Sequence, residues 1–510
     1  MNQNNFYITT PIYYPSGDPH MGHAYSSILA DVFARFSRND NNNVFFLTGT
    51  DEHGLKIQTA AKKNGLTPLE YCDKISLIFK NLTTKLNLSN DDFIRTTEKR
   101  HYKSVSDLWD RLVKSGDIYL SKYKGWYSIS DEAYYKADEI IERDGKKFST
   151  FSGSQVEWVE EDSFFFKLSA WEKKLLEFYE NNNKFILPKA RKNEVINFVK
   201  SGLNDLSVSR TSFSWGIKVP GNEKHIIYVW LDALTNYLSA LNFPNTNDRL
   251  YKNFWPASLH VIGKDILRFH AVYWPAFLLA AKIEPTNRVF SHGWILSGEE
   301  KMSKSKGNIL DPLEVIEKYG IDELRYYLMK EVSHGSDGSI SLKSLENCIN
   351  SDLANNYGNL CQRIFSFVRN NCNYKVVKTK NVSSADKKLI VQTVDLTKDL
   401  RDLMNDQNLN NYIKSVINIS FLTNKYINDE EPWKLKDNKD KMNNILHLSL
   451  EQIAKISILL NPIIPKATAK VLAALNIKLN SVNLSFLDGK VLLPNEIIIK
   501  DLNILFKKIS

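Results

Sequence analysis

Short apolar runs alternate with segments of helical periodicity over the first two thirds of the chain. The first run, residues 6–10, is followed by a proline-rich loop and then by apolar residues at helical spacing over 24–36. A second run, 44–47, precedes another helical segment that begins near Leu55. Strands that alternate with helices in this order predict an α/β fold on a parallel sheet.

The same alternation returns after residue 220. Apolar runs at 225–233, 259–262 and 288–291 each end in glycine or a charged residue and then meet a helical segment. We expect these runs to be further strands of the same doubly wound sheet.

Two stretches break the alternation. Residues 116–220 hold short aromatic strands between acidic turns and read as an insertion, and beyond a glycine-rich joint near residue 335 nearly everything is helical. We therefore expect a Rossmann-type parallel-sheet domain with an insertion, followed by an α-helical bundle. The expected boundaries are 1–115 for the first half of the sheet domain, 116–220 for the insertion, 221–330 for the second half, 331–350 for a linker, 351–475 for the bundle and 476–510 for a tail that packs back.

Composition restricts the class of protein. Hydrophobic residues make up 43% of the chain and charged residues 25%, and no run is long enough to cross a bilayer. The polar first residues do not form a signal peptide, so we expect a cytoplasmic location. Four cysteines without a Cys-x-x-Cys pair argue against a disulfide framework.

The net charge of +9 is unevenly placed. Residues 351–510 hold 23 Lys and Arg against 15 Asp and Glu. A basic excess in a helical region suits a polyanion such as RNA, although a general abundance of Lys and Asn is an alternative explanation.

The loop before the first long helix ends in Asp18-Pro19-His20-Met21-Gly22-His23. A helix start presents unpaired N–H groups and a partial positive charge, which together favour a phosphate. Two imidazoles three residues apart share a face, and Gly22 leaves no side chain between them to block a nucleotide. The alternatives are a pair of surface histidines or a chance metal pair.

A second motif, Glu300-Lys301-Met302-Ser303-Lys304-Ser305-Lys306-Gly307-Asn308, follows the last apolar run. Lysines on nearly alternate positions among small residues form a cationic loop suited to a leaving polyphosphate. A solvated basic loop is the alternative. The two motifs in this order, each after a strand-like run, are far more specific than either alone.

Polar residues also follow the other predicted strands. Asp51 comes directly after the second run, where parallel sheets bind ligands, and is a candidate partner for a substrate ammonium. A cap for the helix that begins near Leu55 is the alternative. The later strands end in residues suited to the phosphates and ribose of a nucleotide: Gly263, Lys264, Asp265 and Gly293.

The helical region carries its own candidates. Asn355, Asn359 and Arg363 form a polar row beside an apolar stripe. Such a row can read base edges, although a solvated face is the commoner explanation. Trp433, fixed after Pro432 in a turn, is either a stacking platform for an unpaired base or a core anchor.

These motifs resemble those of the class I aminoacyl-tRNA synthetases, whose His-Ile-Gly-His and Lys-Met-Ser-Lys-Ser signatures match residues 20–23 and 301–305, with Met21 at the variable second position of the first. The resemblance narrows to the methionyl-tRNA synthetases and covers nearly the whole chain. It rests on Thr50-Asp51-Glu52-His53-Gly54, Tyr228-Val229-Trp230-Leu231-Asp232-Ala233, Ile262-Gly263-Lys264-Asp265, Phe269-His270 with Trp274, and Glu431-Pro432-Trp433. Tyr13 and Leu234 stand where some relatives carry proline.

The resemblance implies a role for each matching residue. Catalysis would fall to His20, His23, Lys301 and Lys304. ATP would be bound by His20, Gly22, His23, Gly263, Lys264, Asp265, Gly293, Lys301, Met302, Ser303 and Lys304. The methionine pocket would consist of Ile12, Tyr14, Asp51, Trp230, Ala233, Tyr237, Ile266, His270 and Trp274, and the anticodon would be read by Asn355, Asn359, Arg363, Pro432 and Trp433.

Ile266, His270 and Trp274 also fall at i, i+4 and i+8 of a helix expected over 266–279. Without the surrounding motifs, such a stripe would more often be part of a core. Aromatic walls nevertheless suit a polarizable thioether, and Asp51 would supply the countercharge for an α-ammonium.

The resemblance also implies substrates and partners. A methionine–tRNA ligase activates L-methionine with ATP and Mg²⁺, releases pyrophosphate and transfers methionine to the 3′ end of tRNA(Met). Many relatives bind zinc in the connective-peptide insertion, but residues 116–220 contain no cysteine, so we expect no structural zinc. An insertion of roughly a hundred residues is too short for the editing domain of the leucine, isoleucine and valine synthetases. No extra OB-fold of the kind that dimerises some relatives is seen, so we expect a monomer and no membrane partner.

Three rival readings remain open at this point. A class I synthetase for another amino acid, such as cysteine, is the nearest, and the missing zinc ligands count against it. A nucleotide-binding or RNA-binding protein without catalysis is opposed by intact His20, His23, Lys301 and Lys304. A small-molecule nucleotidyltransferase would share the histidine motif but would not need a basic helical bundle.

Overall fold

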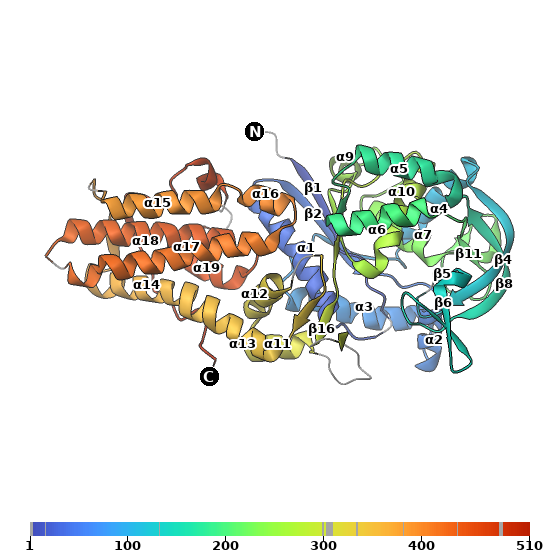
Figure 1. Ribbon diagram of the computed structural model, residues 1–510, viewed down its shortest axis with the longest axis horizontal. Helices are drawn as coiled ribbons and strands as arrows, with labels where there is room; N and C mark the ends of the chain where they lie inside the picture. Colours follow the sequence, from blue (N-terminus) through green and yellow to red (C-terminus); the bar gives the residue numbers. More distant parts are fainter. Residues whose placement is uncertain are drawn as a thin grey trace. The chain divides into compact units, whose positions relative to one another are not determined.

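The computed structural model describes residues 4–15, 17–131, 133–297, 300–301, 310–332, 335–380, 382–435, 437–478 and 483–509. The chain divides into two compact units, and each is described by itself (Figure 1). The sheet unit consists of Asn5–Pro19 and Phe45–Ser291. The helical unit consists of His20–Val44 and His292–Ser510, together with Met1–Asn4.

A six-stranded sheet forms the centre of the sheet unit, with the strand order β3-β2-β1-β14-β15-β9. The pairs β1–β14, β2–β3 and β9–β15 run parallel. Leu259–Ile262 in β14 are buried throughout, which explains why the central strands read as continuous apolar runs. The expected α/β fold is therefore confirmed. The strands are β1 (Asn5–Thr9), β2 (Asn43–Thr50), β3 (Asp92–Arg95), β9 (Ile186–Leu187), β14 (Leu259–Gly263) and β15 (Val289–His292).

Helices of the sheet unit follow these strands in the order that the sequence predicts. A helix begins at Leu55, after the second strand, although its N-cap is Gly54 and not Asp51. The alternative that Asp51 caps this helix is therefore wrong. The helices are α2 (Leu55–Lys63), α3 (Pro68–Lys85), α4 (Lys99–Lys114), α5 (Glu172–Asn181), α6 (Lys189–Lys200), α7 (Val229–Leu234), α8 (Asn236–Ser239), α9 (Arg249–Phe254) and α10 (Trp274–Ala280).

The expected insertion, 116–220, contains smaller antiparallel sheets and one strand of the main sheet. Its longest pair joins β4 to β8, from Ile118 opposite Phe166 to Tyr127 opposite Glu157. Strand β9 leaves this region to pair with β15, so the stretch is not a separate insertion throughout. The additional strands of this region are β4 (Ile118–Ser128), β5 (Ala133–Tyr135), β6 (Ile140–Arg143), β7 (Lys146–Ser149), β8 (Glu157–Phe166), β10 (Leu206–Ser207), β11 (Ser209–Arg210) and β12 (Lys218–Val219), and β13 (Asn222–Ile227) follows directly after it.

The run at 225–233 does not form a strand of the parallel sheet. Its first part belongs to β13, which pairs antiparallel with β11 and β12. Its second part is the short helix α7, which begins when the N–H groups of Leu231 and Asp232 both donate to the carbonyl of Tyr228. The β-branched and aromatic composition of Tyr228–Trp230 favours a strand, whereas the helix in the structure places Asp232 against His53 and His101.

The helix expected over 266–279 is also irregular. A 3₁₀ turn, Lys264–Ile266, leads through two α-helical residues to a π-helical turn, Phe269–Tyr273, and a continuous α-helix begins at Trp274. Turns of the π type widen the helix and often occur at functional sites. The stripe at i, i+4 and i+8 is therefore produced by a wide turn followed by a regular one.

The helical unit begins with α1 (Met21–Asn39), which carries the histidine motif at its start. A small sheet of β17 (Glu300–Lys301), β16 (Ile295–Ser297) and β18 (Gly338–Ile340) follows. The remaining helices include α17 and α18, which lie alongside α14 in the bundle (Figure 1). They are α11 (Pro312–Tyr319), α12 (Ile321–Glu331), α13 (Leu342–Cys348), a π-helical segment (Ile349–Gly358), α14 (Asn359–Cys372), α15 (Ser384–Thr397), α16 (Leu400–Asn405), α17 (Leu409–Glu430), α18 (Lys439–Leu460) and α19 (Pro465–Ala474).

The last residues lie against this bundle. Strand β20 (Glu496–Ile498) pairs antiparallel with β19 (Lys375–Val377). The carboxylate of Glu451 in α18 accepts hydrogen bonds from the N–H groups of Leu492 and Leu493. Among the described residues, no helix is both long and apolar enough to span a bilayer.

The grouping of the helical unit differs from the expected boundaries, which placed 1–115 in one half-domain. Helix α1 belongs with 292–510 because its fully buried Asp31 pairs with Arg325 of α12 at 2.7 Å. Arg325 also donates hydrogen bonds to the carbonyls of Pro462 and Ile463. The sequence separation of Asp31 and Arg325 hides this pairing from any local pattern.

Candidate functional site

The first histidine motif forms the start of α1. His20 is the N-cap residue, and its Nδ1 accepts a hydrogen bond from the N–H of Gly22 at 3.1 Å. The Nδ1 of His23 accepts in turn from the N–H of His20 at 3.1 Å. The two rings stack with 3.8 Å between their centroids. The structure thus brings the two predicted imidazoles together at a helix N-terminus.

This capping arrangement determines where the imidazoles carry their protons. Because each Nδ1 accepts from a backbone N–H, the neutral ring must carry its proton on Nε2. Burial, and secondarily the neighbouring His20, lowers the pKa of His23 well below its ordinary value. At neutral pH His23 is therefore an uncharged Nε2–H donor, which is suited to a phosphate oxygen.

The structure explains why glycine is needed at two of the predicted ATP-site positions, Gly22 and Gly293. A Cβ at Gly22 would lie 3.0 Å from the His20 ring. A Cβ at Gly293 would lie 2.1 Å from the carbonyl oxygen of Ser336, so the chain itself needs glycine there. Gly293 follows His292, whose Nε2 accepts a hydrogen bond from the Ser26 hydroxyl of α1 at 2.7 Å.

The lysine motif is only partly described. Lys301 ends β17, where its backbone pairs with Leu296 of β16. Met302, Ser303 and Lys304 lie outside the described residues. The convergence of these lysines with the imidazoles on one triphosphate stays a prediction.

The remaining ATP candidates follow β14 in the sheet unit. Gly263 is the last residue of the strand, and Lys264 and Asp265 open the 3₁₀ turn that follows. Asp265 is exposed, whereas Gly263 and Lys264 are half-buried. This is the carboxyl end of a parallel strand, where sheets of this kind bind ligands.

The nine predicted methionine-pocket residues all belong to the sheet unit. Tyr237 and Trp274 are members of its hydrophobic core, with 1% and 0% of their surface exposed. The partly exposed members pack against that core: Ile12, Tyr14, Trp230 and Ile266. Apolar residues that remain partly open above a rigid core are what a site for a small apolar side chain requires.

A hydrogen bond fixes the polar part of this wall. The Tyr237 hydroxyl lies 2.8 Å from Nε2 of His270, and Nδ1 of His270 lies 3.0 Å from the carbonyl oxygen of Ile266. The carbonyl can only accept, so Nδ1 carries the proton and Nε2 accepts from Tyr237. Burial lowers the pKa of His270 to about 4. The imidazole is therefore neutral at neutral pH, which suits an uncharged thioether.

Asp51 lies directly after β2, with 7% of its surface exposed. Its N–H donates to the carbonyl of Tyr13 at 2.9 Å, and the Tyr14 hydroxyl donates to the carbonyl of His53 at 2.8 Å. The segments 12–14 and 51–53 are therefore bound to each other. These hydrogen bonds therefore fix the backbone of Asp51, the predicted partner of the ammonium, relative to the backbone of Tyr14.

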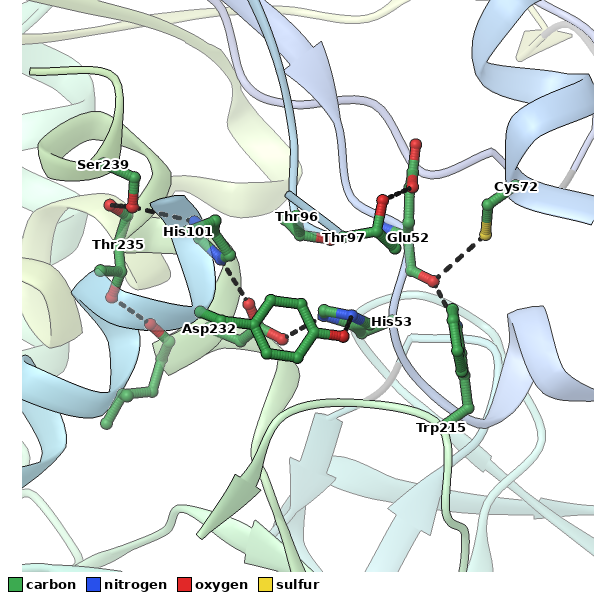
Figure 2. A network of polar contacts seen from close by, with 12 residues as sticks. Glu52, His53, Cys72, Thr96, Thr97, His101, Trp215, Asp232, Thr235 and Ser239 are labelled. Carbon is green, nitrogen blue, oxygen red and sulfur yellow. Dashed lines mark hydrogen bonds and ion pairs between the residues drawn. The ribbon is translucent and has the colours of Figure 1, made fainter. Parts of the chain in front are cut away.

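A buried polar network for which the sequence predicts no function lies beside this loop (Figure 2). Asp232 of α7 is fully buried between two imidazoles, at 2.7 Å from Nδ1 of His53 and 2.6 Å from Nε2 of His101. Glu52 pairs with Arg95 at 2.7 Å. Asp232 could have been noticed in the sequence, because it is an acidic residue inside the apolar run 229–234. Nothing in the residues around His101 indicates that it belongs to this network.

Two further residues near the predicted pocket were missed. His260 is fully buried, stacks on Tyr237 at 4.1 Å and lies within 2.8 Å of the Thr9 hydroxyl. A histidine inside an otherwise apolar strand was the signal for it. Phe269 stacks on Trp230 with 3.7 Å between ring centroids and an interplanar angle of 5°.

The helical unit contains a pocket of about 350 Å³ beside α14. Trp433 lies two residues after Glu431, the left-handed C-cap of α17, and 39% of its surface is exposed. It is therefore not a core anchor. The lining combines apolar, amide and guanidinium groups: Arg363, Ile364, Ser366, Phe367, Asn370, Asn371, Ile427, Pro432 and Trp433.

The predicted polar row runs from the π-helical segment, with Asn355, into α14, with Asn359 and Arg363, and is only partly brought to this pocket. Arg363 lines it, whereas Asn355 and Asn359 do not. Asn355 is exposed and Asn359 is half-buried. The neighbouring Asn356 points inward instead and accepts a hydrogen bond from Ser420 of α17 at 2.9 Å.

No group of three or more His, Cys, Asp and Glu side chains within the described residues is arranged to hold a metal ion. The four cysteines are free thiols; Cys72, Cys348 and Cys361 are buried. Burial raises the pKa of each of these three thiols.

Comparison with known families accounts for both units. Residues 6–146 and 144–365 match the family of class I tRNA synthetases of the methionine type. Residues 376–510 match the anticodon binding domain of methionyl tRNA ligase. The chain belongs to the methionyl-tRNA synthetases.

Individual members of this family match almost the whole chain. The methionine–tRNA ligase of Brucella suis is 48% identical over 474 residues, which cover 92% of each protein. That of Rickettsia typhi is 48% identical over 479 residues, which cover 93% of this chain and 94% of the relative. The Mycobacterium tuberculosis methionyl-tRNA synthetase in complex with methionyl-adenylate is 41% identical, with a TM-score of 0.96 over 99% of this chain and 100% of that one.

Membership in the methionyl-tRNA synthetases confirms the expected fold class and enzyme class. A parallel-sheet domain and a helical anticodon-binding domain are present in the expected order. The rival readings as a small-molecule nucleotidyltransferase or as a synthetase for cysteine are wrong, because the match to the methionine family extends through the anticodon domain.

Proposed function

We propose that the chain joins L-methionine to tRNA(Met) in two steps. A carboxylate oxygen of methionine attacks the α-phosphorus of ATP, the bond to the bridging oxygen breaks and pyrophosphate leaves. A ribose hydroxyl at the tRNA 3′ end then attacks the carbonyl carbon of the adenylate, and AMP leaves. Membership in the family supports the reaction, and the geometry of the sheet unit supports the choice of amino acid.

The observation that carries the choice of amino acid is the neutral hydrogen-bonded pair of Tyr237 and His270. Burial raises the pKa of Tyr237 and lowers that of His270, so neither group is charged at neutral pH. An uncharged, polarizable wall favours a thioether over a charged or strongly polar side chain. Asp51, on the loop bound to Tyr13, is the proposed partner of the α-ammonium.

The proposed phosphate site begins with His20 and His23. Their Nε2–H groups, at the positive end of α1, would stabilise the charge that grows on the phosphate oxygens as pyrophosphate leaves. Lys301 and Lys304 would supply full positive charges to the same oxygens. The nucleotide itself would contact Gly22, Gly263, Lys264, Asp265, Gly293, Met302 and Ser303.

Mg²⁺ is proposed as a companion of ATP. It binds phosphate oxygens and keeps several waters, with few protein ligands, so it would arrive with the nucleotide and neutralise phosphate charge.

The residues proposed to bind the tRNA anticodon are Asn355, Asn359, Arg363, Pro432 and Trp433. Because the enzyme would act on tRNA, we place it in the cytoplasm.

Pyrophosphate exchange tests this proposal. Purified enzyme is incubated with ATP and labelled pyrophosphate, and each standard amino acid is added in turn. We expect exchange to depend on methionine, and a higher kcat/KM with any other amino acid would contradict the proposal. Charging of a total tRNA pool, followed by identification of the charged species, tests the second step.

A further inference from the structure

Asp232 is the centre of a network that joins three elements of the sheet unit (Figure 2). Its carboxylate is fully buried, and each oxygen has an imidazole partner. Oδ2 lies 2.7 Å from Nδ1 of His53, and Oδ1 lies 2.6 Å from Nε2 of His101. His53 follows β2, His101 belongs to α4 and Asp232 belongs to α7, so one carboxylate holds all three elements.

Each imidazole is supported on its other side. Nε2 of His53 lies 3.1 Å from the Tyr102 hydroxyl, and Nδ1 of His101 lies 3.0 Å from the Ser239 hydroxyl of α8. A carboxylate can only accept, so the facing nitrogen of each ring carries a proton. Both ring orientations are therefore determined, and neither histidine can turn away without leaving a buried group unsatisfied.

The network also lies between the two halves of the proposed methionine site. His53 is two residues beyond Asp51, and its carbonyl accepts the hydroxyl hydrogen bond of Tyr14. Asp232 stands between Trp230 and Ala233 in the same short helix. The loop that would hold the ammonium and the helix that would line the side chain are thus joined through Asp232.

Neither segment can hold this arrangement alone. Helix α7 is 6 residues long, far shorter than a helix that is stable by itself. Residues 51–53 have no regular secondary structure. Apolar contacts tolerate small shifts, whereas a carboxylate between two N–H donors accepts one geometry. A binding site loses affinity when such supporting contacts are relaxed by even about 1 Å.

We propose that Asp232 is a positioning residue for methionine, which sets the distance between Asp51 and the aromatic wall at Trp230. This inference rests on the proposed methionine site. Asp232 touches neither substrate; it acts through His53 and through α7. His101 holds it from the opposite side.

The decisive variant is Asp232→Asn, which keeps the shape but replaces one acceptor with an N–H₂ donor. One of the two imidazoles then faces a donor. We expect the KM for methionine in pyrophosphate exchange to rise about tenfold, with the KM for ATP changed less than about twofold. An equal rise in both KM values would overturn the proposal.

Ser104→Ala is the matched control for lost stability. Ser104 lies in α4, three residues after His101, and its hydroxyl donates to the carbonyl of Phe243 without touching the network. This variant should lower Tm and leave the KM for methionine unchanged. If it raises that KM as much as Asp232→Asn does, at temperatures equally far below each Tm, the effect is structural and the proposal is wrong.

A double-mutant cycle tests the route through Asp51. Methionine binding is measured by equilibrium dialysis for Asp51→Asn, Asp232→Asn and the double variant. If Asp232 acts by placing Asp51, its substitution changes the Kd less than about twofold once the Asp51 charge is gone. Fully additive effects would overturn the proposed route.

His101→Gln provides a second variant if Asp232→Asn does not fold. The glutamine amide can still donate to Asp232 but cannot reach Ser239 as the imidazole does. We expect a rise of about threefold in the KM for methionine, again with little change for ATP. No rise would overturn the proposal, whereas a wild-type enzyme without methionine-dependent exchange would instead refute the proposed function.

Discussion

The guanidinium of Arg363 lies over the indole of Trp433, with 5.8 Å between its central carbon and the ring centroid. Its Nη2 also donates a hydrogen bond to Oδ1 of Asn428 at 2.8 Å. The cation is thus held at the edge of the pocket beside an exposed aromatic face. An unpaired base that stacks on Trp433 would meet a planar donor whose position Asn428 already fixes.

Trp433→Ala should reduce charging of tRNA while leaving activation of methionine intact. Base stacking on an aromatic ring contributes about 1–3 kcal/mol, so we expect kcat/KM for tRNA to fall about 10- to 100-fold. Pyrophosphate exchange should stay within about twofold of wild type. Both activities are measured on the same preparation.

Phe421→Ala is the matched control for this variant. Phe421 is an aromatic residue of α17 that is 50% exposed and does not line the pocket. Its removal should leave charging unchanged. Equal loss of exchange and charging in Trp433→Ala would argue against a separate anticodon role.

His20→Ala removes two functions, since the side chain both caps α1 and presents Nε2–H. Loss of the cap costs about 1 kcal/mol of stability. Loss of a donor to a developing charge costs about 10²- to 10³-fold in kcat for exchange. The KM for methionine should change little, because the proposed methionine residues lie elsewhere.

His20→Asn separates these two functions. Asparagine is an excellent N-cap residue, so the Tm should return toward that of the wild type. The imidazole is still absent, so kcat should stay low. Recovery of kcat along with Tm would show that His20 serves the helix and not the reaction.

The elements that the sequence predicts correctly are those with a uniform burial pattern, either buried on both faces or buried along one face. Strand β14 is buried on both faces, so its apolar run is continuous, and α1 has one buried face, so its period is helical. The stretch 228–234 was misassigned because its side chains favour a strand. In the structure it is helical, and it brings Asp232 to histidines that lie 131 and 179 positions away in the sequence.

The residues of the candidate site also divide into those that a local sequence pattern predicts and those that it does not. The imidazoles at the start of α1 follow from a local pattern, and so does the aspartate after β2. His101 could not be predicted, because a histidine in an amphipathic helix carries no sign of the carboxylate that it meets. The π-helical turn at Phe269–Tyr273 was likewise hidden, since a spacing of four residues fits both a wide and a regular turn.

Lower pH should destabilise the sheet unit through His270. Burial lowers the pKa of this imidazole from an ordinary 6.5 to about 4, so the folded state favours the neutral ring. That stability is fully present above pH 6.5 and is lost as the pH falls toward 4, because the unfolded chain then binds the proton first. The loss from this residue alone is at most ~3 kcal/mol.

His270→Gln should weaken this pH dependence. Glutamine can still accept from Tyr237 but does not titrate. The difference in Tm between pH 7 and pH 5 should be smaller in the variant by a few degrees, measured by differential scanning calorimetry. Asp232 does not contribute in this window, because its two imidazole partners outweigh the cost of burial and lower its pKa to about 2. Identical pH profiles for wild type and variant would contradict the prediction.

Arg325→Met should strongly destabilise the helical unit. Asp31 and Arg325 are both fully buried, and removal of Arg325 leaves the Asp31 carboxylate paired with Arg35, at 2.7 Å, whose side chain is 19% exposed. The electrostatic cost should therefore be below the about 3–5 kcal/mol of a fully unpaired buried charge. The carbonyls of Pro462 and Ile463 also lose their donor. We expect Tm to fall by several degrees in scanning calorimetry. Adding Asp31→Leu should restore part of that loss, since the buried carboxylate is then removed and the partly exposed Arg35 can turn its charge to solvent. Lys318→Met provides the contrast, because its pair with Glu346 is 3.9 Å long and its side chain is 63% exposed, so Tm should hardly change. A double variant less stable than Arg325→Met would contradict the prediction, because it would show that the buried Asp31 carboxylate still stabilises the unit through Arg35.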